Sequence, residues 1–204
     1  MLHAITQFRK NLASVKDIES IYSLVEQNFP LLKSQSEELL RATIALAVSA
    51  LDHYIHDCVR IGMLEIYIGD RDGCDMYNRF PISMKTVLEL INAPSAAQID
   101  ILESVIVKKN GFDSFHSPKG IEYALRIISI DRIWSKLSVK LNTPADDIKE
   151  KLGLIVERRN KIVHEADFNI VTSQKYPIDA GMIRGVVDFV EQLCESLHII
   201  LTET

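Results

Sequence analysis

The sequence predicts an all-α protein, an up-and-down helical bundle with additional short helices between residues 83 and 141. Apolar residues recur at helical spacing through most of the chain, and no segment alternates as a strand does. Proline and glycine are few and stand between the periodic stretches. The 204 residues fit a single domain, 1–204, or one domain with a modest insertion, which would lie at 70–120.

The predicted helices follow one another through short connections. Residues 2–29 form one or two helices, and Pro30 closes them. Ser36 then caps a long helix that we expect at the centre of the bundle. A cap at Thr143 opens the helix that carries the candidate site, and this helix runs to about Ala166. The remaining helices are expected at 83–91, 95–108, 118–128, 130–141 and 178–201, with Trp134 in the core rather than on a base-stacking surface.

The sequence contains two candidate metal sites, and we reject both. His53 and His56 are three residues apart, but a zinc site needs further ligands at suitable spacing, so a polar helix face is expected there. The turn-rich loop 69–75 has calcium-like acidic spacing, yet Pro81 stands where an EF-hand needs its glutamate. We therefore expect no cofactor and no metal.

Composition restricts the class of protein further. A net charge of −5 argues against a general nucleic-acid coat, although an RNA enzyme could still work with a local basic cleft. Three cysteines without CxxC spacing indicate a reducing, cytoplasmic setting. No apolar run is long enough to cross a bilayer, so no membrane association is expected.

One arginine breaks the apolar pattern of the helix that opens at Thr143. On a helical wheel, its apolar residues fall in one sector roughly 120° wide. They are Ile148, Leu152, Ile155, Val156, Ile162, Val163 and Ala166. Arg159 falls in the middle of that sector. An isolated buried charge costs several kcal/mol unless it is paired or faces solvent, and such violations tend to mark functional or strained sites.

Two polar residues flank this arginine. His164 lies about 140° further round the wheel and shares a face with Asn160. Arginine offers a planar donor fork for a phosphate, and histidine titrates near neutrality. RNA cleavage by the substrate's own 2′-hydroxyl needs these two groups and no nucleophilic residue. The alternative is a helix whose arginine extends to solvent and whose histidine is simply exposed.

A family resemblance rests on the same residues. It is carried by the run Arg158-Arg159-Asn160-Lys161-Ile162-Val163-His164-Glu165-Ala166-Asp167 and by Ala50-Leu51-Asp52-His53-Tyr54-Ile55-His56-Asp57. The first run resembles the Arg-x(4–6)-His signature of the HEPN superfamily, and both runs are closest to its RiboL-PSP-HEPN branch. The resemblance covers roughly residues 36 to 200, is weakest between 70 and 120, and implies a HEPN-like helical fold.

The resemblance also implies an activity, a metal-independent endoribonuclease that leaves 2′,3′-cyclic phosphate and 5′-hydroxyl ends. His164 would transfer the proton, Arg159 would hold the phosphate, and Asn160 would orient the imidazole or the phosphate, unless it is a plain surface residue. One histidine cannot be base and acid at once, and in such families the site resembles a cleft shared by two protomers. A homodimer acting on RNA is therefore expected.

Other charged residues receive supporting roles. The candidate RNA-binding residues are Arg158 and Lys161. Glu157 could tune the imidazole, although an i,i+4 ion pair with Lys161 explains it equally well. Asp52 or Asp57 could supply the carboxylate that a buried Arg159 requires.

The resemblance suggests host defence or toxin–antitoxin-like control as the setting. A separate antitoxin or sensor protein would then be the partner, because the chain shows no second domain. Two other classes remain open. One is a non-catalytic HEPN-like dimerisation or nucleotide- or RNA-binding module that acts with a partner. The other is a structural all-α interaction protein.

Overall fold

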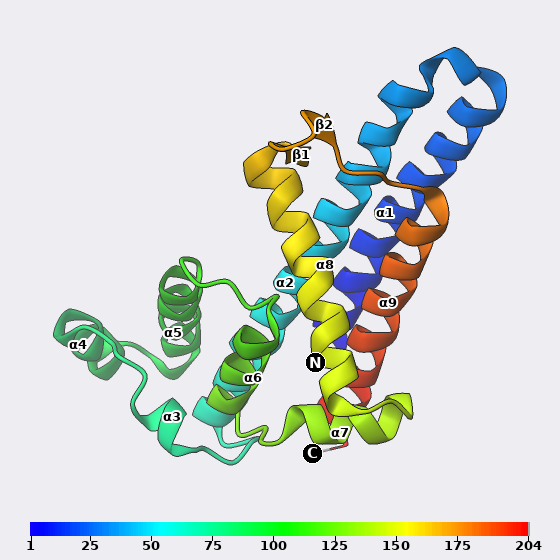
Figure 1. Ribbon diagram of the computed structural model, residues 1–204. Coiled ribbons are helices and arrows are strands. Elements are labelled where there is room, and N and C mark those ends of the chain that lie inside the picture. Colours follow the sequence, from blue (N-terminus) through cyan, green and yellow to red (C-terminus); the bar gives the residue numbers. More distant parts are fainter. Residues whose placement is uncertain (204) are drawn as a thin grey trace.

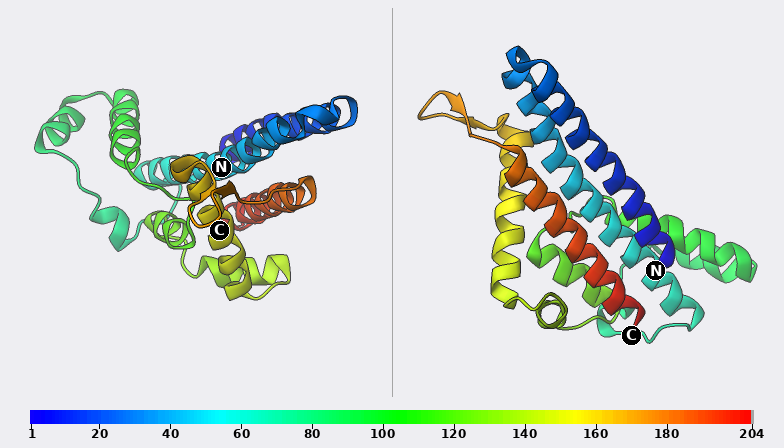
Figure 2. Two further views of the ribbon diagram at one scale, coloured as in Figure 1. Left: turned by 45° about the horizontal axis from the view of Figure 1, so that its top comes forward. Right: turned by 90° about the vertical axis from the view of Figure 1, so that its right-hand side faces the viewer.

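The computed structural model describes residues 1–203, which form a tilted bundle of long helices with shorter helices beside it (Figure 1). The bundle consists of α1 (Leu2–Asn28), α2 (Lys33–Ile68), α8 (Ala145–Glu165) and α9 (Ala180–Thr202). Successive members run in opposite directions, and α2 contacts the other three (Figures 1 and 2). The predicted all-α, up-and-down bundle with a central second long helix is therefore confirmed.

The shorter elements lie between α1 and α2 and between α2 and α8. They are η1 (Pro30–Leu32), α3 (Asp75–Asn78), α4 (Met84–Asn92), α5 (Ser95–Asn110), α6 (Pro118–Ile127) and α7 (Ile133–Leu141). Helices α3 to α5 stand to one side of the bundle, whereas α7 lies across the ends of α8 and α9 (Figure 1). The prediction of short helices between residues 83 and 141 is confirmed. Helix α3 was not predicted.

Two predicted helix caps are wrong. The 3₁₀ turn η1 leads directly into α2, so that helix begins at Lys33 with Leu32 as its N-cap. Ser36 lies inside the first turn and donates its hydroxyl to the Lys33 carbonyl at 2.8 Å. Helix α8 begins at Ala145, and the Thr143 hydroxyl bonds back to Leu141 instead of capping it. The N-cap is therefore Leu32 for α2 and Pro144 for α8, and neither Ser36 nor Thr143 caps a helix.

Two glycines in the C-terminal part of α2 have different roles, one in packing and one in ending the helix. Gly62 lies where a Cβ atom would come within 2.7 Å of the Ile128 side chain, so α2 and the segment after α6 pack closely only because that atom is absent. Gly69 ends the helix in a left-handed conformation with φ of 87°, which glycine adopts without steric cost. The predicted turn-rich loop follows it.

The apolar faces of the long helices meet in one core. Trp134 is 6% exposed within it, as predicted, although its indole N–H has no partner in the described chain. Cys58 and Cys194 are buried free thiols. Burial raises the pKa of the Cys58 thiol to about 12. Over residues 1–203, no helix combines the length and apolar character needed to cross a membrane.

Candidate functional site

The candidate site lies at the C-terminal end of α8, where that helix leaves the core. The apolar stripe is confirmed for its first four members, Ile148, Leu152, Ile155 and Val156, which are buried. The last two turns differ from the prediction, because Val163 is 49% exposed and Ala166 lies beyond the helix. The open end of the stripe leaves apolar and charged side chains together at the surface.

The helix stops where two residues turn left-handed. Ala166 and Asp167 have φ of 52° and 59°, and the Asp167 N–H bonds to the Lys161 carbonyl at 2.9 Å. A two-stranded hairpin follows, with β1 (Phe168–Asn169) antiparallel to β2 (Gln174–Lys175). The sequence predicted helices on either side of residues 167–177 and no strand between them, because two-residue strands are too short to show alternation.

Arg159 is half-buried in the opened stripe, as its wheel position predicts. Its Nη1 donates to the Asn160 side-chain oxygen at 3.1 Å, and its Nε is buried with no partner in the described chain. No carboxylate within residues 1–203 forms an ion pair with it. A guanidinium without a counter-ion, with a buried donor left over, is suited to receive an anion.

His164 stands exposed one turn further along α8, in the last turn of the helix. Within residues 1–203 its side chain forms no hydrogen bond or ion pair, so no polar contact joins the imidazole to the Arg159 or Asn160 side chain. The Asn160 amide therefore positions Arg159, and not the imidazole, in the single chain.

Glu157 and Lys161 form the simple i,i+4 ion pair, at 2.8 Å, that was one of the two interpretations of Glu157. This contact lowers the pKa of Glu157 and raises the pKa of Lys161. The Lys161 ammonium also lies 5.3 Å from the centre of the Tyr176 ring. Lys161 remains positively charged at the edge of the site.

Arg158 does not have the surroundings expected of an RNA-binding residue. Its Nη2 donates to Asp167 Oδ2 at 2.8 Å and to the carbonyl oxygens of Pro177 and Tyr176 at 3.0 and 3.3 Å. Its guanidinium also lies 5.3 Å from the Tyr176 ring centre. The group is committed to internal contacts, because the segment after α8 folds back over it.

Neither Asp52 nor Asp57 is the partner of Arg159. Asp52 accepts a hydrogen bond from the Phe115 N–H at 2.6 Å and lies 3.3 Å from His116 Nδ1. Asp57 is bound by Arg60, at 3.0 Å. Both hypotheses required contact between α2 and the end of α8. In the fold this part of α2 contacts α5 and the loop before α6 instead.

The two histidines on α2 join the same polar surface. His53 Nε2 is 3.6 Å from Asp57, and His56 Nε2 is 3.9 Å from Asp52. The centres of the His56 and Phe115 rings are 4.4 Å apart, and the ring planes are tilted by 34°. No group of three or more histidine, cysteine, aspartate or glutamate side chains within the described residues is arranged to hold a metal.

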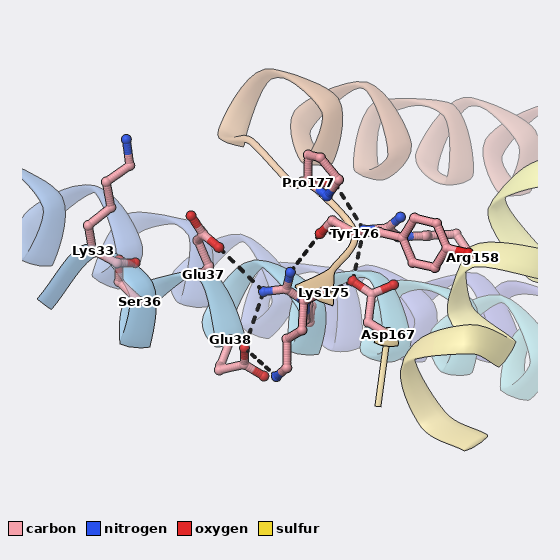
Figure 3. A network of polar contacts seen from close by, with 10 residues as sticks. Lys33, Ser36, Glu37, Glu38, Arg158, Asp167, Lys175, Tyr176 and Pro177 are labelled. Carbon is pink, nitrogen blue, oxygen red and sulfur yellow. Dashed lines mark hydrogen bonds and ion pairs between the residues drawn. The ribbon is translucent and has the colours of Figure 1, made fainter. Parts of the chain in front are cut away.

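Sequence reasoning missed three residues beside the site: Arg41, Asp167 and Tyr176. Arg41 on α2 is 3% exposed and donates from Nε to Asp167 and from Nη2 to the Tyr176 carbonyl, each at 2.8 Å. Figure 3 shows Asp167, Tyr176 and Arg158 converging in this network. A signal was present, because Arg41 lies beside Leu40 and Ile44 on an apolar helix face, just as Arg159 does on α8.

An all-α bundle that places Arg-x4-His late in one of its long helices has the arrangement of a HEPN domain. The family model described as RiboL-PSP-HEPN matches residues 9–203. The chain therefore belongs to the RiboL-PSP-HEPN family. No curated protein and no solved structure gives a significant match. Membership is consistent with either an RNase or a nucleotide-binding module.

Proposed function

We propose that this protein is a metal-independent endoribonuclease of HEPN type, acting in host defence or toxin–antitoxin-like control. Its site would be completed by a second copy of the chain. One observation carries the proposal. Arg159 is half-buried on the motif helix and has no carboxylate partner in the described chain, whereas Arg158, whose Nε is likewise buried and unpartnered, is balanced by Asp167. Such a group is costly unless an anion binds to it, and the phosphate of RNA is an anion of suitable geometry.

The chemistry needs only groups that the chain supplies. The 2′-oxygen of the substrate forms a bond to phosphorus, the bond from phosphorus to the 5′-oxygen breaks, and one proton moves from the first oxygen to the second. His164 would accept or donate that proton, while Arg159 would neutralise the charge that accumulates on the phosphate. The products would carry 2′,3′-cyclic phosphate and 5′-hydroxyl ends.

A second protomer would resolve two difficulties in the single chain. No hydrogen bond joins the side chains of Arg159 and His164 in the described residues, and one imidazole cannot be base and acid in the same turnover. Two motif helices meeting at a dyad would supply two imidazoles and two guanidiniums. The exposed Val163 beside them offers apolar surface for such a contact.

The direct test incubates labelled RNA with purified protein in EDTA. We expect cleavage by the wild type and a loss of about 10²–10⁴-fold in rate for Arg159→Ala and for His164→Ala, because each removes a group that acts on the transition state. Matched controls are His3→Ala, an exposed histidine near the N-terminus, and Arg126→Ala, an exposed arginine on α6. Both controls should keep the wild-type rate. Equal rates in all variants would point to a contaminating nuclease and contradict the proposal.

The same unpaired guanidinium also favours a second candidate, a non-catalytic module that binds nucleotide or RNA and acts with a partner protein. Such a module would use Arg159 for the phosphate and leave His164 without a role, in keeping with the lack of any contact to that imidazole in the described chain. RNA binding that depends on Arg159, without cleavage and without any effect of His164→Ala, would support this candidate instead.

A further inference from the structure

A buried carboxylate lies just beyond the motif helix and has no part in the proposed chemistry. Asp167 is 0% exposed, and its Oδ2 accepts one hydrogen bond from Arg41 of α2 and one from Arg158 of α8, both at 2.8 Å (Figure 3). Its Oδ1 is buried and has no partner among the described residues. A carboxylate in these surroundings is tolerated only while both guanidiniums stay in place.

The backbone at the same point is strained. Ala166 and Asp167 are consecutive non-glycine residues with positive φ, a conformation that persists only where the surrounding structure enforces it. The Asp167 N–H bonds to the Lys161 carbonyl at 2.9 Å, and the Asp167 carbonyl accepts from the Tyr176 N–H at 3.0 Å. Through its main chain and its side chain, Asp167 therefore links the end of α8 to Tyr176 and to the two arginines.

The two arginines hold the far end of the hairpin as well. The Tyr176 carbonyl accepts from Arg41 Nη2 at 2.8 Å and from Arg158 Nη2 at 3.3 Å, and Pro177 accepts from Arg158 at 3.0 Å. The hairpin segment is thus clamped at both ends by the same guanidiniums, one from α2 and one from α8. We call these contacts of Arg41 and Arg158 with Asp167, Tyr176 and Pro177 the clamp. It joins the end of α8 to α2, the central helix of the bundle.

The charges in this cluster balance. Arg41 also lies 3.1 Å from Glu38 and 3.7 Å from Glu37, and Lys175 lies 2.7 Å from Glu38. The three cations Arg41, Arg158 and Lys175 thus face the three carboxylates Glu37, Glu38 and Asp167. A cluster whose charges balance in this way offers little attraction to RNA, in contrast to the uncompensated Arg159 nearby.

We infer that Asp167 is a positioning residue for His164, with Arg41 and Arg158 as its anchors. The inference rests on the proposed function. Arg158 precedes Arg159, so its hold on Asp167 fixes the rotation of α8 that places the Arg159 guanidinium. His164 lies three residues before Asp167, less than one helical turn away. Without the clamp the last turn of α8 frays, and the imidazole moves before the better packed Arg159 does.

The test compares Asp167→Asn, which keeps the shape and removes the charge, with Glu165→Gln, which removes an exposed carboxylate from the same turn. We expect Asp167→Asn to lower kcat for RNA cleavage by about tenfold or more while KM stays within about twofold, because a displaced acid–base group loses rate rather than binding. Backbone amides at 162–166 should exchange with deuterium about tenfold faster, with those in the middle of α9 unchanged. Glu165→Gln should change neither quantity.

A milder variant keeps the inference testable if Asp167→Asn does not fold. Arg158→Lys retains the charge but lacks the donor fork, and it should show the same pattern at smaller amplitude. Unchanged exchange at 162–166, or a fall in kcat that merely follows the folded fraction, would overturn the inference.

The two proposals fail in different ways. If the wild type cleaves no RNA, the proposed function fails, and the exchange measurement still decides whether Asp167 holds the last turn. If the wild type cleaves RNA and both Asp167→Asn and Arg158→Lys keep wild-type kcat and exchange, the positioning role fails while the proposed function stands.

Discussion

At the scale of single residues, Arg158 and Arg159 show that the surroundings of a guanidinium decide whether its charge is paired within the fold. The residues are adjacent, yet Arg158 bonds to a buried carboxylate and to backbone carbonyls, whereas Arg159 contacts only the neutral Asn160 side chain. A charge-assisted hydrogen bond contributes about 1.5–3 kcal/mol, and a buried donor left unpaired costs a similar amount. Arg158 is therefore held by internal contacts, whereas the charge of Arg159 has no ionic partner in the described chain.

The Asp52 carboxyl allows a stability prediction. Burial raises the pKa of Asp52, but the hydrogen bonds from His116 and from the Phe115 N–H lower it by more, so its pKa lies below the usual value. A carboxyl whose folded-state pKa is lowered stabilises the fold above its unfolded pKa of about 3.9 and loses this effect as the pH falls through the folded value. Asp52→Asn should cost about 1–3 kcal/mol at pH 7 in urea unfolding.

The difference between Asp52→Asn and the wild type should then shrink below about pH 4. Asp131→Asn serves as the control, because that carboxylate is 78% exposed and its ion pair with Arg126 is 3.5 Å long. An exposed pair of this kind contributes about 0–1 kcal/mol. A gap for Asp52→Asn that stayed constant down to pH 2.5 would show that the carboxylate charge has no such role.

At the scale of elements, two helical glycines should respond oppositely to alanine. In α2, a Cβ at Gly62 would meet the buried Ile128 side chain at 2.7 Å, whereas a Cβ at Gly153 in α8 would meet nothing within 4 Å. Gly62→Ala should destabilise by about 1–3 kcal/mol because overpacking exceeds the gain in helix propensity. Gly153→Ala should stabilise by about 0.5–1 kcal/mol. Thermal unfolding measures both, and a more stable Gly62→Ala would contradict the close packing of α2.

Helices with a strong apolar period could be predicted from the sequence, and their exact starts could not. The stripes of α2 and α8 identify both helices, but the caps assigned to Ser36 and Thr143 are wrong, because the turn η1 leads into α2 at Lys33 and Pro144 holds the N-cap position of α8. The hairpin was not predicted, and the reason is different. Its position depends on Arg41, which is 126 residues from Asp167, and local pattern contains no such information.

The candidate site could likewise be predicted only in part. Arg159 stood out because a charge in an apolar stripe is a local anomaly, and its half-buried position agrees with that expectation. Its supposed carboxylate partners, Asp52 and Asp57, were wrong because pairing between helices depends on their register and rotation. The roles of Asn160 and His164 in catalysis remain predictions.

At the scale of the whole molecule, the proposed function implies that one chain would supply only half of the site. The last turns of α8 hold Arg159 without an ionic partner, His164 without a side-chain hydrogen bond in the described residues and Val163 half exposed. This end of α8 lies next to the hairpin β1–β2 (Figure 1). A two-fold dimer through this end would place two such helices together and bury the exposed apolar surface.

The most direct measurement is RNA cleavage in EDTA by a heterodimer of one wild-type subunit and one subunit carrying both Arg159→Ala and His164→Ala, purified with two different tags. A site composed from both subunits would lose its second histidine and arginine, so the rate should fall about 10²-fold or more below that of the wild-type dimer. Half the wild-type rate would mean that each subunit cleaves independently. That result, or the absence of cleavage by the wild-type dimer itself, would contradict the account.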